Sequence, residues 1–132
     1  MTLALANAKI NQLEKALASF KKGILENPSD IERDGAIQRF EYSFELSWKT
    51  LKTVLEYFGV EDCKSPRKAL QAGLIQGFIN TKDQEVWLKM LDDRNQTTHI
   101  YHEEVASSIF SHLHQYYQLM LHLKNKLKKE LK

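Results

Sequence analysis

Apolar residues recur every three or four positions along most of this sequence, a spacing that places them on one face of an α-helix. The first stripe consists of Ala6, Ile10, Leu13, Leu17, Phe20 and Ile24. The second consists of Ile37, Phe40, Phe44, Trp48, Leu51, Leu55 and Phe58. The third consists of Val105, Ile109, Leu113, Tyr116, Met120, Leu123 and Leu127. The pattern predicts three long amphipathic helices that bury their apolar faces against one another.

Helix-terminating and capping residues separate these segments. Asn27-Pro28-Ser29-Asp30 ends the first helix and caps the second, and Gly59 is a natural residue to follow the second helix. Ser65-Pro66 begins a short helix, because proline suits the first helical position. The second, third and last helices are expected over about 31–58, 66–76 and 103–131, and a fourth starts after 80–83 and carries Val86, Trp87, Met90 and Leu91.

Residues 95–98, Asn-Gln-Thr-Thr, are weak helix formers, so a kink or break is predicted there. Short connections favour sequential helices as neighbours. The sequence therefore predicts an all-α fold, an antiparallel up-and-down bundle of four or five helices, with residues 1–132 forming a single domain. The aromatic stripe of Phe40, Phe44 and Trp48 is expected in the core. A polar stripe lies beside it on the same helix: Gln38, Glu41, Glu45, Lys49 and Lys52.

Composition narrows the class of protein further. A chain of 132 residues with 42% hydrophobic and 27% charged residues is ordinary for one globular domain. With only Cys63, it is neither a disulfide scaffold nor a cysteine-based zinc module. No apolar run approaches the ~18 residues of a membrane span, and residues 1–8 lack the features of a secretory signal. The expected location is the cytoplasm.

The formal charge of +2 hides an uneven distribution. Residues 124–132 hold five lysines and one glutamate, a charge of +4, so the remaining 123 residues carry −2. The body is therefore no general nucleic-acid binder, and any RNA contact would be local. The basic end is either a solvated helix terminus that complements the helix dipole or a contact for a phosphate backbone.

The densest polar stretch runs from Asp92 to His102. Arg94 offers a fork of donors suited to a phosphate, His99 can move a proton near neutral pH, and Tyr101 offers a hydroxyl. On an unbroken helix Arg94 and His99 would point about 140° apart. Either a break brings them together, or a second chain completes the site. The alternative is a structural helix junction with solvated aspartates, Arg94 in a salt bridge and His99 packed.

Other chemistries have weaker support. His99, His102 and Glu103 could contact a metal, but their spacing matches no zinc signature, so no metal and no cofactor are expected. No phosphate-binding glycine-rich loop is present, and Cys63 has no activating motif nearby.

The sequence resembles the nucleotidyltransferase substrate-binding protein family of the HEPN superfamily. The resemblance lies in the segments 34–52 (DGAIQRFEYSFELSWKTLK), 65–67 (SPR), 72–75 (AGLI), 90–95 (MLDDRN) with Trp87, and 98–101 (THIY). These segments follow one another in order from residue 34 to residue 101. The resemblance implies a helical bundle that acts with a minimal nucleotidyltransferase, often as toxin and antitoxin, as a homodimer or a heterotetramer with that partner.

The resemblance also implies site residues. Arg94, Asn95 and His99 match the superfamily's metal-independent ribonuclease pattern, which is built where two protomers meet. Tyr101 occupies the position that the nucleotidyltransferase adenylylates, and Asp93, Thr98 and His102 are candidates for supporting roles. Two other functions stay open: a non-catalytic subunit that presents a nucleotide or substrate, and a helical adaptor that binds only protein.

Overall fold

The computed structural model describes residues 2–132, and over these residues it contains helices and no strands. The five α-helices are α1 (Leu3–Gly23), α2 (Asp30–Tyr57), α3 (Pro66–Ile75), α4 (Gln84–Gln96) and α5 (Glu103–Glu130). Two short 3₁₀ turns, η1 (Thr81–Asp83) and η2 (Thr97–His99), flank α4. The all-α prediction is confirmed, and every predicted helix is present within a few residues of its expected bounds.

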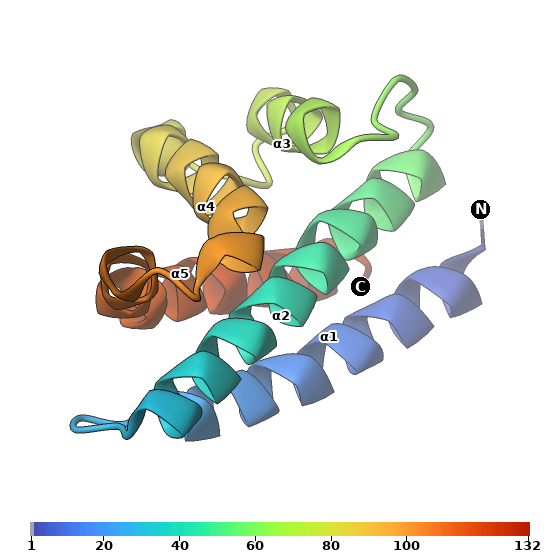
Figure 1. Cartoon of the computed structure of the whole chain (residues 1–132). Coiled ribbons are helices and arrows are strands. Elements are labelled where there is room, and N and C mark those ends of the chain that lie inside the picture. Colours follow the sequence, from blue (N-terminus) through green and yellow to red (C-terminus); the bar gives the residue numbers. More distant parts are fainter. Residues whose placement is uncertain (1) are drawn as a thin grey trace.

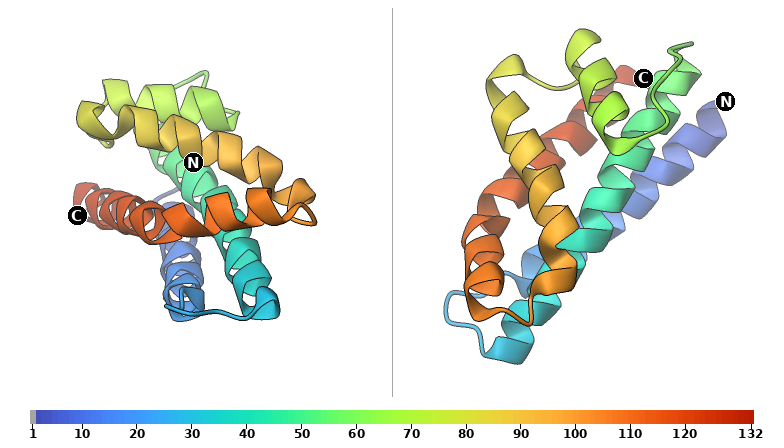
Figure 2. Two further views of the ribbon diagram at one scale, coloured as in Figure 1. Left: turned by 60° about the vertical axis from the view of Figure 1, so that its left-hand side comes forward. Right: turned by 45° about the horizontal axis from the view of Figure 1, so that its top comes forward.

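The long helices α1 and α2 run antiparallel side by side, and α5 packs against both (Figure 1). The shorter α3 and α4 follow one another along the other side of α2, and α4 leads through η2 into α5 (Figure 2). Helices that follow one another in the sequence therefore also lie beside one another in the structure. This arrangement places the α4–α5 connection beside the first half of α2.

Local sequence signals explain where the helices begin and end. Ser29 caps α2 with a complete capping box, in which its hydroxyl accepts from the Glu32 amide and the Glu32 carboxylate accepts from the Ser29 amide. Ser65 caps α3 by accepting from the Lys68 amide. Gly59, with φ of +84°, follows α2 in the left-handed region that favours glycine.

The core lies where α1, α2 and α5 meet, and the predicted stripes fill it except at helix ends, where Ile24 and Val105 are only partly buried and Phe58 is 48% exposed. Phe40 and Phe44 are completely buried, and Trp48 is 8% exposed. The Tyr116 ring of α5 stacks on Phe40 of α2 with ring centroids 5.3 Å apart. No helix among the described residues is both long and apolar enough to cross a membrane.

Candidate functional site

The connection between α4 and α5 carries most of the residues that the sequence singles out. The α-helix ends at Gln96, continues for one 3₁₀ turn, and gives way to a turn before Glu103. The break thus falls at the weak helix formers, as predicted. It leaves Tyr101 73% exposed at the tip of the connection.

Arg94 lies one turn before the break and forms an ion pair with α2. Its Nε is 2.8 Å from Oε1 of Glu45, although the N–H is not aligned for a hydrogen bond. The other carboxylate oxygen of Glu45 accepts from Trp48 Nε1 at 3.2 Å and lies 3.9 Å from Lys49 Nζ. Glu45 is therefore fixed by its own helix and in turn fixes the guanidinium.

Thr97 attaches η2 to α2. Its side chain is buried, and Oγ1 is 2.8 Å from both a Glu41 carboxylate oxygen and the Arg94 carbonyl. The single hydroxyl proton serves one of these acceptors at a time. Glu41 and Glu45 are one turn apart on α2, so two carboxylates of the polar stripe hold the end of α4.

His99 and Tyr101 lie together beyond this anchor. His99 Nδ1 is 3.3 Å from Tyr101 Oη, and the Tyr101 ring also lies 4.4 Å, centroid to centroid, from the His102 ring. All three side chains are exposed. Among residues 2–132, no hydrogen bond or ion pair joins Arg94 to His99, so the break alone does not pair the two side chains.

The remaining polar residues of this stretch have different environments. Asn95 and Thr98 are exposed and their side chains have no hydrogen-bond partner in the described part of the chain, as is also true of Asp92. Asp93 instead accepts a 2.5 Å hydrogen bond from the hydroxyl of Tyr116. Burial, reinforced by this carboxylate, raises the pKa of Tyr116 far above its ordinary value.

A buried arginine holds the other end of the connection. The Arg33 side chain is 10% exposed, and its Nη1 donates to Glu103 Oε1 at 2.6 Å, at the first residue of α5. Its Nε donates to Asp34 at 3.1 Å. Hydrogen bonding to Glu103 raises the pKa of Arg33, so the guanidinium stays charged.

The structural alternative for this stretch holds in part. Arg94 is in a salt bridge and Asp92 is solvated, but His99 does not pack into the core. Within the described residues, no group of three or more histidine, cysteine or acidic side chains is arranged to hold a metal, and His99, His102 and Glu103 form no such group.

The basic end of α5 is partly neutralised. Lys124 and Lys128 both lie 3.4 Å from Glu14 of α1, and Lys126 pairs with Glu130 at 2.9 Å. Lys124 and Lys128 thus attach the end of α5 to α1, which favours a structural role for these two lysines over a contact with a phosphate backbone.

Sequence reasoning missed Glu45, Glu41, Arg33 and Tyr116 as residues that support the site. The first two belong to the polar stripe of α2, and a polar stripe bordering a buried one is the signal that could have identified them. Arg33 and Tyr116 gave no such signal, because their partners lie 70 and 23 positions away.

Comparison with known proteins agrees with this fold. The family model described as "Nucleotidyltransferase substrate binding protein like" matches residues 8–129. A crystal structure from Thermus thermophilus superposes with a TM-score of 0.83 at 42% identity, covering 87% of this chain and 98% of that one. The Haemophilus influenzae protein HI0074, described as revealing the fold of a substrate binding domain of a nucleotidyltransferase, superposes with a TM-score of 0.68 at 26% identity, covering 96% and 99%.

A curated relative adds a second description. The Haemophilus influenzae protein named "Probable ribonuclease HepT" is 34% identical over 89 residues. The match covers 60% of this chain and spans 56% of that relative's length.

Proposed function

Because the chain belongs to the nucleotidyltransferase substrate-binding protein family, we propose that it is the toxin-like, RNA-cleaving partner of a minimal nucleotidyltransferase. The observation that carries the proposal is the contact of His99 Nδ1 with Tyr101 Oη, 3.3 Å apart, on the exposed connection that follows Arg94. A proton carrier and a modifiable hydroxyl thus share one small surface. The relative named "Probable ribonuclease HepT" supports the same chemistry.

The reaction uses the nucleophile that RNA carries itself. The 2′-hydroxyl attacks the adjacent phosphorus, its proton passes to a base, and the bond from phosphorus to the 5′-oxygen breaks as that oxygen takes up a proton. His99 is suited to one of the two proton transfers, because an imidazole nitrogen can accept or donate a proton. Arg94 supplies positive charge to the phosphate as negative charge builds up, and Asn95 orients the phosphate. None of these steps needs a metal.

Modification of Tyr101 would silence this site. The Tyr101 hydroxyl attacks the α-phosphorus of ATP on the partner, pyrophosphate leaves, and the hydroxyl proton passes to a base of the partner. The 73% exposure of Tyr101 makes it accessible to such an enzyme. The attached AMP would place a negative charge beside His99 and would occupy the position of the substrate phosphate.

A second copy of the chain would complete the site, since within residues 2–132 of one chain no hydrogen bond or ion pair joins Arg94 to His99. A surface groove of about 440 Å³ lies between the first half of α2 and η2, lined by Ile31, Gly35 and Ile100 among others. Ile31 is 86% exposed in this groove. Burying such a side chain against a second copy is favourable, by about 2 kcal/mol per isoleucine.

The proposal predicts that the purified chain cleaves RNA without added metal and that co-expression with its partner nucleotidyltransferase adds an AMP-sized mass. His99→Ala should abolish cleavage, whereas His114→Ala, an exposed histidine elsewhere on α5, should leave it intact. Tyr101→Phe should abolish the mass gain, and the exposed control Tyr57→Phe should not. Equal persistence of RNA with wild type and His99→Ala would reject the ribonuclease.

The second copy has its own test by light scattering. Ile31→Glu should give a monomer, whereas Ile75→Glu, which alters an equally exposed isoleucine on α3, should not. An unchanged assembly state in Ile31→Glu would place the contact elsewhere.

One observation favours the second candidate function, a non-catalytic subunit that presents a nucleotide or substrate. Glu45 already neutralises Arg94 at 2.8 Å, which lowers the attraction for a phosphate. In that case Arg94 and His99 variants would change only binding, and the activity of the nucleotidyltransferase would change in the presence of the chain.

A further inference from the structure

A cleft of about 310 Å³ lies between the α3–α4 connection and the C-terminal half of α5. Its volume is near the lower end of the ~300–1,000 Å³ typical of small-molecule sites. Asp83 is eleven residues before Arg94, about 16 Å along α4 at the helix rise, so the cleft is separate from the candidate site. We propose that this cleft binds a nucleoside monophosphate whose base carries an exocyclic amine.

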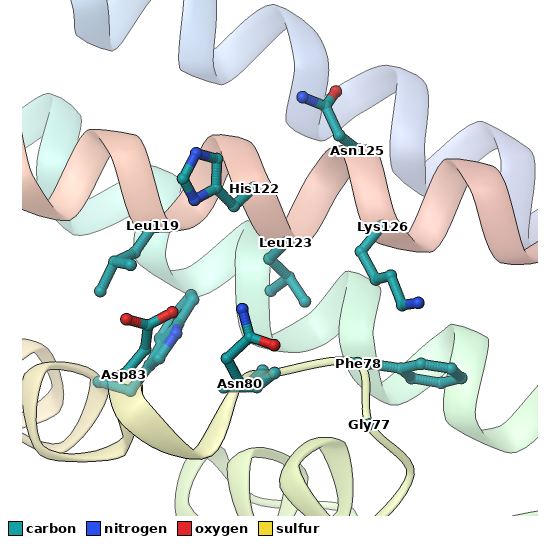
Figure 3. Close-up of a pocket in the computed structure, with 11 residues that line it drawn as sticks. Gly77, Phe78, Asn80, Asp83, Leu119, His122, Leu123, Asn125 and Lys126 are labelled. Carbon is teal, nitrogen blue, oxygen red and sulfur yellow. The ribbon is translucent and has the colours of Figure 1, made fainter.

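The lining places unlike groups at the two ends of the cleft (Figure 3). Asp83 stands at one end with its carboxylate toward α5, Asn80 stands between, and Lys126 reaches down from α5 at the other end. Leu119 and Leu123 point from α5 into the space between them. An occupant therefore meets an acceptor, an amide and a cation in sequence, along an apolar surface.

The polar groups on the α3–α4 side are not used elsewhere in the fold. Asn80 precedes η1 and Asp83 precedes α4, yet neither side chain caps its helix, and neither has another hydrogen-bond partner among residues 2–132. Capping is the usual reason for Asn and Asp at such positions. Their hydrogen-bonding capacity is available to a ligand.

The cation can be redirected to a ligand. Among residues 2–132, Lys126 pairs only with Glu130, at 2.9 Å, as an i,i+4 pair on the surface of α5. Such pairs are weak, since water solvates both ends and the lysine stem must be held in one rotamer. A phosphate dianion held in the cleft competes successfully with that single carboxylate.

The floor determines the class of molecule between the polar ends. Trp87 and Leu123, each 3% exposed, belong to the apolar lining that forms this floor, and Phe78 lies at the Lys126 end (Figure 3). A base is flat and apolar on its faces, and its exocyclic amine donates to a carboxylate such as Asp83. The ribose hydroxyls then meet Asn80, and the phosphate reaches Lys126. A zwitterionic amino acid would match the two charges but would leave the apolar floor uncovered.

The two tryptophans of the chain provide separate reporters for the two sites. Trp87 lies on the floor of the cleft, and Trp48 donates through Nε1 to Glu45, the partner of Arg94. In a ¹⁵N spectrum, saturable addition of AMP should move the indole resonance of Trp87 and leave that of Trp48 in place. Two other ligands should each bind at least fivefold more weakly than AMP. They are adenosine, which lacks the phosphate, and inosine monophosphate, which has a carbonyl in place of the amine.

Charge-removing variants then assign each end of the ligand. Lys126→Met should weaken the binding of AMP at least fivefold without changing the affinity for adenosine. Lys129→Met, at an exposed position, is its control. Asp83→Asn should remove the preference for AMP over inosine monophosphate, and Glu85→Gln, two positions away on α4, should not. All four positions lie at the surface, and unchanged thermal melts would verify that the variants fold.

The proposal is overturned if AMP gives no saturable shift at millimolar concentration, if the Trp48 resonance moves instead, or if neither variant changes the affinity. A glycine titration that matches AMP would overturn the nucleotide assignment. These readouts do not involve RNA cleavage or Tyr101, so the proposed function stands or fails independently of them.

Discussion

Removing one buried hydroxyl should change the pH range over which this protein is stable. Tyr116 is completely buried, and its hydroxyl donates at 2.5 Å to the half-buried carboxylate of Asp93. A hydrogen bond to a charged group contributes about 1.5–3 kcal/mol. Water can partly replace the hydroxyl at Asp93, so Tyr116→Phe should lower the free energy of unfolding at pH 8 by about 1.5 kcal/mol, near the lower limit.

The sign of the pH dependence follows from the raised pKa of Tyr116. The folded state keeps the proton, whereas the unfolded state loses it above the ordinary tyrosine pKa of 10.0. The contribution of the Tyr116 hydroxyl to the free energy of unfolding is therefore complete below pH 10 and is lost as the pH rises above 10. At pH 11 ionisation of this one tyrosine stabilises the unfolded state by about 1.4 kcal/mol.

Urea unfolding of wild type and Tyr116→Phe between pH 8 and pH 11 tests this reasoning. The difference of about 1.5 kcal/mol at pH 8 should fall nearly to zero at pH 11, because phenylalanine has no proton to lose. Tyr57→Phe, at an exposed position, is the control for general alkaline effects. A difference between wild type and Tyr116→Phe that stays constant over this range would refute the proposed linkage.

Two further predictions concern the connections between helices. Glu103→Gln removes the charged partner of the buried Arg33 and should lower the free energy of unfolding in urea by about 1–2 kcal/mol. Asp62→Asn, which breaks the exposed pair with Lys68, should lower it by less than about 0.5 kcal/mol. Equal losses would show that burial of Arg33 does not matter. Gly59→Ala places a side chain at φ of +84° and should lower the free energy of unfolding by about 1 kcal/mol, although the added carbon meets no atom within 4 Å. An unchanged midpoint of urea unfolding would contradict this backbone argument.

Local patterns predicted the helices well because their causes are local. The 3.6-residue spacing identified the buried face of α2, and Ser29, Gly59 and Ser65 acted at its ends and at the start of α3 as their chemistry requires. The break after α4 was also predictable, since Asn95 to Thr98 favour helix weakly and Thr97 gains a tertiary partner in Glu41.

The candidate site could be predicted only as a list of residues. Arg94, His99 and Tyr101 were identified from their chemistry and from the family resemblance, but the ion pair of Arg94 and the attachment of the connection depend on other helices. The pairing of Arg94 with Glu45 joins positions 49 apart, and that of Arg33 with Glu103 joins positions 70 apart. Such distant pairings depend on how α2 packs against the α4–α5 connection, and periodicity gives no information about that register.

The ion pair between Glu45 and Arg94 is compatible with phosphate binding because of the atom it uses. Glu45 contacts Nε, one edge of the guanidinium, and no hydrogen bond or ion pair within residues 2–132 involves the two terminal nitrogens of Arg94. These nitrogens carry four of the five N–H donors of an arginine. A phosphate can accept from both while Glu45 keeps the planar group oriented, so the carboxylate reduces the net charge and fixes the direction of the remaining donors. In the proposed ribonuclease, the slightly acidic body of the protein would limit RNA binding to groups positioned in this way, and the chemistry would depend on geometry rather than on a broad basic surface.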